Sequence, residues 1–200
     1  MTKEEALKLV AQRIAECEAC KFYPGQNPVP GEGNPEAEIM FIGEAPGKKE
    51  NETGRPFVGA AGKFLAEMLN SIGLERQDVF IANTLKYQPP ENRDPLPEEI
   101  EYQKPFLMKQ IAIIRPKIIC FLGRHALAAV MPDEKRTISQ LHGQLLEGPS
   151  TREGSLRVNQ HYLPLYHPAA ALYNGGMRAT LLADFAKIPE IMDKITTKST

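Results

Sequence analysis

Four short apolar runs, separated by segments with helical periodicity, limit what this 200-residue chain can fold into more than any other feature of its sequence. Each run suits a short buried strand rather than a helix of ordinary length. The runs are residues 37–42, 79–83, 116–123 and 162–166. The helical segments are residues 2–18, 60–72, 96–114, 124–131 and 177–195, the last of them broken near Pro189. Strands that alternate with helices predict an α/β fold with a mainly parallel sheet.

The length and composition predict a single domain over residues 1–200, with enough apolar residues, 42%, for a sizeable core. The net charge of -1 gives no general attraction to nucleic acid or to an anionic membrane, so any nucleic-acid surface must be a local basic patch. No run is long enough to span a membrane. Three cysteines without a secretion signal predict a reducing, cytoplasmic location.

The first apolar run ends in a glycine turn, Gly43-Glu44-Ala45-Pro46-Gly47, which stops regular structure at once. A turn at the carboxyl end of a parallel strand is where open α/β sheets bind ligands. So short a motif leaves two simpler alternatives open, a phosphate-binding glycine loop and a tight strand-to-helix turn. The acid Glu50 and the aromatic Phe57 follow within a few residues, and the longer run through Phe57 is more specific.

Polar residues also follow two other apolar runs. Asn83 ends the second run, and His167 follows the last one. Asparagine often ends a strand for structural reasons, and a single histidine after a strand is usually structural too. An acid, an amide, an aromatic ring and a histidine at one edge of a parallel sheet nevertheless indicate a catalytic pocket. The sequence shows no nucleophile with an adjacent base and no residue set with zinc spacing.

The cysteines and two further residues have several interpretations. Cys17 and Cys20 form a Cys-x-x-Cys pair, which is half of a metal or iron–sulfur site, a redox pair, or two packed thiols. Cys120 lies in an apolar run, which predicts a buried and inert thiol. We interpret His142 as a surface or turn histidine, and Pro164 indicates an edge or irregular position in its strand.

Three blocks of sequence resemble, in the same order, the motifs of family 4 uracil-DNA glycosylases. The first block combines Gly43-Glu44-Ala45-Pro46-Gly47 with Thr53-Gly54-Arg55-Pro56-Phe57-Val58-Gly59. The second joins Asn83-Thr84-Leu85-Lys86 to Pro89-Pro90-Glu91-Asn92-Arg93-Asp94-Pro95, and the third is His167-Pro168-Ala169-Ala170-Ala171-Leu172. The strand end Leu122-Gly123 and the turn Leu141-His142-Gly143 also fit. The resemblance spans nearly the whole chain.

The resemblance implies a four-stranded parallel sheet flanked by helices. It also implies the removal of uracil from DNA by hydrolysis of the N-glycosidic bond, which leaves an abasic site. An enzyme of this kind must flip the base out of the duplex to reach it. Phe57 would stack on the flipped base, and the amide of Asn83 would read the uracil edge and reject cytosine. The expected partner is uracil-containing DNA, bound by a monomer that does not engage a membrane.

The other implied roles concern catalysis. His167 and the backbone amides of the Gly43-Glu44-Ala45 turn would stabilise the negative charge on the departing uracil. Glu50 has two roles that remain open. It would either orient water and offset the positive charge of the sugar, or wall off the ring position that carries the methyl group of thymine.

The resemblance further implies contacts with DNA around the pocket. Ala171 and Leu172 would fill the space that the flipped base leaves. Basic residues in or beside the motif loops would contact phosphates, a scatter of solvated charges being the alternative. These basic residues are Arg55, Lys86, Arg93 and Arg178, together with Lys48, Lys49 and Lys63.

One departure from the family concerns a cofactor. Family 4 members typically bind a four-iron, four-sulfur cluster through four cysteines, and Cys17 and Cys20 match the first pair. Tyr87 and Gln103 stand where the other two cysteines are expected. A cluster requires a thiolate or an equivalent ligand on every iron. We therefore expect no cluster and no other cofactor, with Tyr87 and Gln103 packed or hydrogen-bonded in that region.

Two other classes of function remain as alternatives. One is a non-catalytic DNA-lesion-binding protein on the same fold, because a fold alone does not determine function. The presence of Asn83 and His167 argues against it. The other is a small-molecule nucleotide hydrolase that uses the glycine turn for phosphate. The sequence lacks a Gly-Lys-Ser or Gly-Lys-Thr motif, which argues against the hydrolase.

Overall fold

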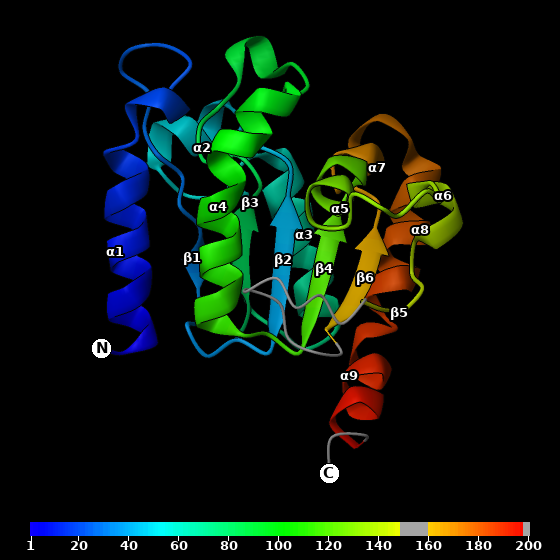
Figure 1. Cartoon of the computed structure of the whole chain (residues 1–200). Helices are drawn as coiled ribbons and strands as arrows, with labels where there is room; N and C mark the ends of the chain where they lie inside the picture. Colours follow the sequence, from blue (N-terminus) through cyan, green and yellow to red (C-terminus); the bar gives the residue numbers. More distant parts are fainter. Residues whose placement is uncertain (149–159, 198–200) are drawn as a thin grey trace.

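The computed structural model describes residues 1–148 and 160–197, and these residues form one six-stranded sheet with helices on both faces (Figure 1). The strand order is β1-β3-β2-β4-β6-β5. The strands are β1 (Glu32–Gly33), β2 (Ile39–Gly43), β3 (Phe80–Asn83), β4 (Ile118–Leu122), β5 (Leu146–Glu147) and β6 (His161–Leu165). The four central strands are parallel and correspond to the four predicted apolar runs.

Two short edge strands correct the expectation of a four-stranded sheet. β1 pairs antiparallel with β3, and β5 pairs antiparallel with β6. Each edge strand has two residues, so neither shows the alternation of apolar and polar side chains that identifies a strand in a sequence. The α/β class and the mainly parallel pairing are confirmed.

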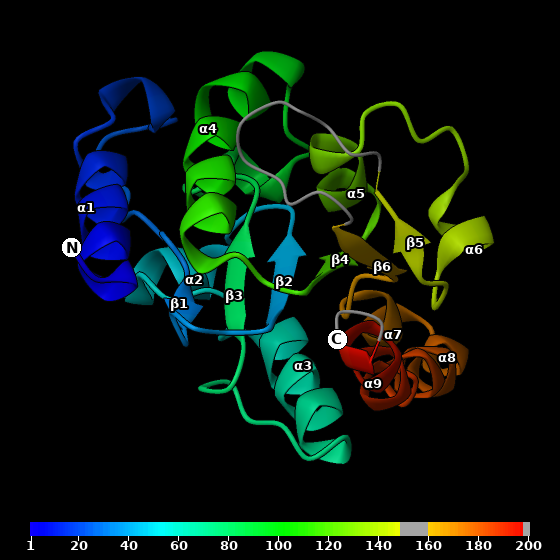
Figure 2. The ribbon, with the colours of Figure 1, turned by 60° about the horizontal axis from the view of Figure 1, so that its bottom comes forward.

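Helices cover both faces of the sheet, which gives three layers (Figure 2). One face carries α3 (Ala60–Ser71), α8 (Gly175–Phe185) and α9 (Ile188–Thr197). The other carries α4 (Pro97–Ile114), α5 (Arg124–Val130) and α6 (Ile138–Leu141), and α1 (Lys3–Ala15) packs beside α4. The short elements are α2 (Lys48–Thr53), α7 (Ala170–Tyr173) and the 3₁₀ turns η1 (Glu18–Cys20) and η2 (Pro90–Asn92). In the part of the chain that the structure describes, no helix is long and apolar enough to cross a membrane.

The central strands are buried on both faces, and this explains their nearly continuous apolar sequence. In β2, Phe41 faces the core beneath α3 and α8, whereas Met40 and Ile42 face the core beneath α4 and α5. A strand buried in this way has no room for a polar side chain along its length. Polar residues therefore come only after its carboxyl end, at the edge of the sheet where a ligand can enter.

The ends of the helices follow local signals in the sequence. Thr2 Oγ1 accepts a hydrogen bond from the Glu5 amide at 3.1 Å, and the Glu5 carboxylate accepts one from the Thr2 amide at 2.7 Å. This capping box starts α1. The predicted last helix is divided into α8 and α9, with Pro189 in the first turn of α9. The sequence does not predict α2 and α7, which have six and four residues, because helical periodicity cannot show over so few positions.

Cys120 is fully buried in β4, as predicted, and burial raises the pKa of its thiol. The edge or irregular position indicated for Pro164 agrees with the pairing of β6. The strand β5 pairs only with His161 and Tyr162, and beyond them the Pro164 carbonyl accepts a hydrogen bond from the Gly143 amide at 2.9 Å. That side of β6 is therefore open to a proline.

His142 lies in a turn, as indicated, but it is half-buried rather than at the surface. Its Nδ1 atom lies 2.6 Å from the buried carboxylate of Asp184, and its ring packs against Tyr166. His142 thus fixes the chain just before His167.

Candidate active site

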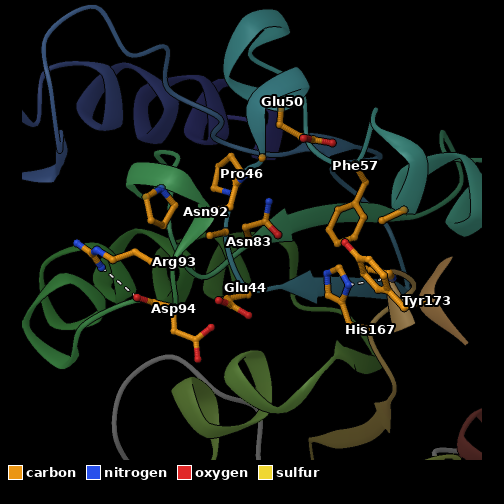
Figure 3. Close-up of a pocket in the computed structure, with 15 residues that line it drawn as sticks. Glu44, Pro46, Glu50, Phe57, Asn83, Asn92, Arg93, Asp94, His167 and Tyr173 are labelled. Carbon is orange, nitrogen blue, oxygen red and sulfur yellow. Dashed lines mark hydrogen bonds between the residues drawn. The ribbon is translucent and has the colours of Figure 1, made fainter. Parts of the chain in front are cut away.

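A cavity of about 540 Å³ opens at the carboxyl ends of the parallel strands (Figure 3). It is lined from the turn after β2, from α2, from the end of β3, from the loop before α4 and from the segment after β6. Several predicted site residues meet there, and they are Glu44, Ala45, Glu50, Phe57, Asn83, Arg93 and His167. Segments that are far apart in the sequence therefore contribute to one site.

Asn83 forms the floor of the cavity. Its side chain is buried, and its Oδ1 atom has no hydrogen-bond partner among the residues that the structure describes. Asn83 lies beside Gly43 in the sheet, and a Cβ atom on Gly43 would be 2.4 Å from Asn83 Oδ1 and 2.6 Å from Phe57 Cζ. Only glycine leaves room for both side chains. A buried oxygen without a donor is costly, so a ligand that brings an N–H group to this point would be favoured.

Phe57 forms the wall next to Asn83 and is held in an unfavourable backbone conformation. Its φ is 50°, in the left-handed region. Arg76 donates hydrogen bonds to the carbonyl oxygens of Phe57, at 2.9 Å, and of Pro56, at 2.7 Å. The Phe57 and His167 ring centroids lie 5.7 Å apart. The contacts of Arg76 thus hold the backbone from which the Phe57 ring enters the cavity.

His167 lines the cavity directly beyond β6. Its Nδ1 atom accepts a hydrogen bond from the Ala169 amide at 3.1 Å. Burial lowers the pKa of His167 to about 4, although the charge of Glu50 acts in the opposite direction. The ring is therefore neutral at pH 7, and because Nδ1 is an acceptor, the proton is on Nε2. His167 can donate a hydrogen bond from Nε2.

Glu50 belongs to α2, and the backbone of a later segment holds its carboxylate in place. Its Oε1 atom accepts hydrogen bonds from the amides of Val58, at 2.9 Å, and Gly59, at 2.8 Å. Gly59 immediately precedes α3, and the amino end of a helix stabilises negative charge. Both bonds use Oε1, so the carboxylate is fixed while Oε2 is left for a molecule in the cavity.

Glu44 faces a charged group at the mouth of the cavity. Glu44, Asp94 and His125 each place one possible metal ligand within 4.8 Å of the others. Arg124 already contacts this group, since its Nε donates to His125 Nε2 at 3.0 Å and its Nη2 lies 3.1 Å from Asp94 Oδ2. Burial raises the pKa of Glu44, and His125 partly opposes that effect. The guanidinium group of Arg124 therefore pairs with one of the two carboxylates, that of Asp94.

Tyr173 is a residue of the cavity that the sequence did not single out. It ends α7 at the mouth of the cavity and is 91% exposed. The adjacent Leu172 is 50% exposed, whereas Ala171 packs partly against the core. The sequence carried one signal for Tyr173, its position immediately after the last motif.

Lys86 does not lie where the sequence predicted. It is fully buried behind the floor of the cavity, so the prediction that it contacts DNA is wrong. The loop that carries it is covered by α4, and two amide side chains of that helix, Gln103 and Gln110, hydrogen-bond to Lys86. Nothing in the local sequence reveals these acceptors, which come from a different element.

The predicted arginines are exposed, and each pairs with a carboxylate. The pairs are Arg55 with Glu32, Arg93 with Glu99, and Arg178 with Glu67. Of the three arginines only Arg93 lines the cavity. Lys48, Lys49 and Lys63 are also exposed, and within residues 1–148 and 160–197 they have no ion pair. The lysines of α2 are therefore exposed, free of ion pairs among the described residues, and next to cavity residues Gly47 and Glu50.

The region of the cysteine pair differs from a cluster site. Cys17 and Cys20 form a disulfide. The buried Tyr87 donates its hydroxyl hydrogen bond to the Ile14 carbonyl at 2.7 Å, and the buried Gln103 donates to the Cys20 carbonyl at 3.2 Å. Two sulfurs bonded to each other, with a phenol and an amide already engaged, do not supply the four thiolates of a four-iron cluster. The residues present do not fit that group.

Comparisons with known proteins agree with the family that the sequence motifs indicated. Residues 30–189 match the model of the Uracil DNA glycosylase superfamily. A Type-4 uracil-DNA glycosylase of Sulfurisphaera tokodaii is 46% identical over 192 residues, which is 94% of this chain and 85% of the relative. Proteins with the same name from Archaeoglobus fulgidus and Thermotoga maritima are 44% and 39% identical, over 95% and 96% of this chain and 95% and 98% of the relatives. The chain therefore belongs to the uracil DNA glycosylase superfamily.

Proposed function

We propose that this protein is a uracil-DNA glycosylase of base excision repair, which flips uracil out of DNA and hydrolyses its N-glycosidic bond. The observation that carries the proposal is the buried Oδ1 atom of Asn83, which has no donor among the described residues and lies beside the ring of Phe57. The names of the relatives point to the same substrate. A flat base that presents an N–H group can hydrogen-bond to Asn83 at the floor and stack on the ring of Phe57 at the wall.

The amide of Asn83 selects uracil by its edge. The N3–H group of uracil donates to Asn83 Oδ1, and the amide nitrogen donates to uracil O4. Cytosine carries an acceptor at N3 and an amino group at position 4, so both pairs would be mismatched. A site built to hydrogen-bond one edge rejects a base with the opposite pattern, because its buried polar groups are then left unpaired.

The chemical step breaks the bond between C1′ of the sugar and N1 of uracil. The bonding electron pair leaves with uracil, whose negative charge spreads onto its oxygens, while the sugar becomes cationic. His167 Nε2–H donates to a uracil oxygen and stabilises this charge, as in an oxyanion hole. Water adds to C1′ and gives up a proton, which balances the uracil anion. The products are free uracil and an abasic site.

Glu50 orients the attacking water and offsets the positive charge of the sugar. Two backbone amides hold its carboxylate through Oε1, which keeps Oε2 in one place beside the cavity. The competing role is a steric wall against the methyl group of thymine. Glu50→Ala separates the two roles: loss of uracil release without gain of thymine release supports water orientation, and gain of thymine release supports the wall.

DNA binds across the mouth of the cavity. Lys48 and Lys49 on α2 contact phosphates next to the flipped nucleotide, since they are exposed and adjoin cavity residues Gly47 and Glu50. The exposed side chains of Leu172 and Tyr173 lie at the end of α7, where an apolar or aromatic group can occupy the gap in the base stack.

The protein acts as a cytoplasmic monomer.

The activity requires no iron. The cysteine region supplies only two of the four sulfurs, those of Cys17 and Cys20, and Tyr87 and Gln103 make internal hydrogen bonds in place of metal ligands. We expect a colourless protein that remains active in the presence of an iron chelator. A brown protein with stoichiometric iron and an absorbance band of an iron–sulfur cluster would contradict this.

The test of the function is release of free base from labelled oligonucleotides that carry uracil, thymine, hypoxanthine or xanthine, followed by detection of abasic sites. We expect uracil release from the wild-type protein and strongly reduced release from His167→Ala. Binding of uracil-containing DNA without release of base would instead identify a non-catalytic DNA-lesion-binding protein.

A further inference from the structure

Lys86 has no exposed surface, whereas every other lysine and arginine among the described residues reaches solvent at least in part. It lies three residues after Asn83, directly behind the floor of the cavity. Removing an ammonium group from water is costly, and here burial lowers the pKa of Lys86 to about 7. Because burial of this ammonium group costs free energy, we looked for a role that the buried charge could serve.

The ammonium group of Lys86 is fully hydrogen-bonded by neutral oxygens. Nζ donates to the Asn83 carbonyl at 2.7 Å, to Gln110 Oε1 at 2.8 Å and to the Pro30 carbonyl at 3.4 Å. These three acceptors match the three protons of an ammonium group. Within the described part of the chain no carboxylate forms an ion pair with Lys86. Below a pH of about 7 the group carries a positive charge, which these oxygens solvate and which no carboxylate in the described part of the chain neutralises.

The backbone of Lys86 is fixed as firmly as its side chain. Its amide donates to Gln103 Oε1 at 2.6 Å, and its carbonyl accepts from the Val29 amide at 2.8 Å. The lysine thus ties the end of β3 to α4 and to the loop before β1. Among these contacts, the shortest one made by Nζ is to the carbonyl of Asn83, the residue whose amide faces the cavity.

We propose that Lys86 is a positioning residue of the uracil site, which holds Asn83 from behind and places an unpaired positive charge behind the amide that faces the base. This inference rests on the proposed function. The charge on uracil develops only as the glycosidic bond breaks, so a fixed cation behind the floor stabilises the transition state more than the bound substrate. Lys86 acts through Asn83 and does not itself touch the base.

The test compares Lys86→Met, which keeps the length of the side chain but removes its donors and charge, with Lys109→Met. Lys109 is an exposed lysine of α4, and residues 1–148 and 160–197 offer it no ion pair. We expect Lys86→Met to lower single-turnover release of uracil about 10- to 100-fold, as for loss of one nearby charge at an effective dielectric constant of about 20. DNA affinity should stay within about two-fold, because Lys86 is buried. Lys109→Met should match the wild type.

A second substrate separates an electrostatic role from damage to the fold. In 5-fluorouracil the fluorine withdraws electrons, so the departing base is a more stable anion and needs less help from the protein. The loss caused by Lys86→Met should be several-fold smaller on DNA that contains 5-fluorouracil than on DNA that contains uracil. If Lys86→Met does not fold, Lys86→Gln, which keeps a donor without the charge, should show the same dependence on substrate.

The outcomes are distinct. Wild-type protein that releases no uracil contradicts the proposed function and, with it, the role of Lys86. Active wild-type protein together with a folded Lys86→Met of nearly normal rate overturns the role of Lys86 alone. An equal loss on uracil and on 5-fluorouracil, in either variant, also overturns it, because a purely structural defect does not depend on the leaving base.

Discussion

The floor and the mouth of the cavity are built in different ways. At the floor, Asn83, Phe57 and His167 lie at or near the ends of strands. A hydrogen bond between a side-chain atom and a backbone atom holds each of them in place. At the mouth, Arg93 pairs with another side chain at the surface, and Tyr173 is almost fully exposed. A fixed floor suits a reaction that needs defined geometry, whereas an exposed rim suits a long, variable partner such as DNA. Changes at the floor should therefore alter turnover, and changes at the mouth should alter binding.

His167→Ala should give the largest effect on turnover. It removes a donor aimed at charge that exists only in the transition state, and such a loss typically lowers the rate about 10²- to 10³-fold. DNA affinity should remain nearly intact. Single-turnover cleavage measures the loss of rate, and equilibrium binding measures the affinity.

Leu172→Ala is the matched change at the mouth. It should impair release of uracil from duplex DNA more than from single-stranded DNA, where no gap in a base stack has to be filled. Equal losses of DNA binding in Leu172→Ala and His167→Ala, with normal cleavage of bound substrate, would erase the distinction between floor and mouth.

The partly buried, neutral state of His167 predicts a dependence of stability on pH. Its folded pKa of about 4 lies below the ordinary value of 6.5, so the unfolded chain takes up the proton first as the pH falls. Stability should decline between about pH 6.5 and 4, by up to about 3 kcal/mol at about 1.4 kcal/mol per pKa unit. Urea unfolding of the wild type and of His167→Gln at several pH values measures the free energy of unfolding. The variant should lack the part of the decline that His167 causes. A variant with the same slope as the wild type would show that His167 is not buried in its neutral form.

Phe57→Ala should reduce the rate by an amount that corresponds to roughly 1–3 kcal/mol, by analogy with base–aromatic stacking. Arg76 would still hold the backbone carbonyl of residue 57, so the variant should lose the ring without losing the course of the chain. Comparison of kcat/KM on uracil-containing DNA measures this. An unchanged value would place the stacking face elsewhere.

The smallest effects are expected for the lysines of α2. The double change Lys48→Ala and Lys49→Ala should reduce the slope of log affinity against log salt by about 0.9 for each phosphate that the variant no longer neutralises. Cleavage of bound substrate should be unchanged. Binding that is independent of salt in the wild type would rule out a phosphate-binding surface here.

The contrast between floor and mouth also explains what the sequence could predict. Asn83 and His167 follow buried strands, and parallel strands bring their carboxyl ends to the same edge, so their convergence was predictable from the order of elements. Tyr173 and the short helix α7 were not predictable, because four residues show no periodicity. β1 and β5 escaped detection for the same reason, having two residues each.

Lys86 shows the limit of local reasoning most clearly. A lysine beside a proline-rich loop, as Lys86 is within the second block of the resemblance, is typical of a surface residue. Its ammonium group is hydrogen-bonded by Gln110 and by the carbonyl of Pro30. Neither residue belongs to the blocks that resemble the family motifs. Only the packing of α4 over the loop brings these acceptors together. The cysteine region was easier, since the replacement residues Tyr87 and Gln103 could be read directly from the sequence.

The most direct measurement of the central claim is base release by wild type and Asn83→Asp from oligonucleotides that differ only in carrying uracil or cytosine at one position. The wild-type protein should release uracil and leave cytosine in place. Asn83→Asp should release uracil more slowly and release cytosine relatively faster, because its carboxylate can accept from the cytosine amino group but has no amide donor for uracil O4. A variant that keeps both the wild-type rate on uracil and the wild-type rejection of cytosine would contradict the assignment of this floor as the site that reads the base.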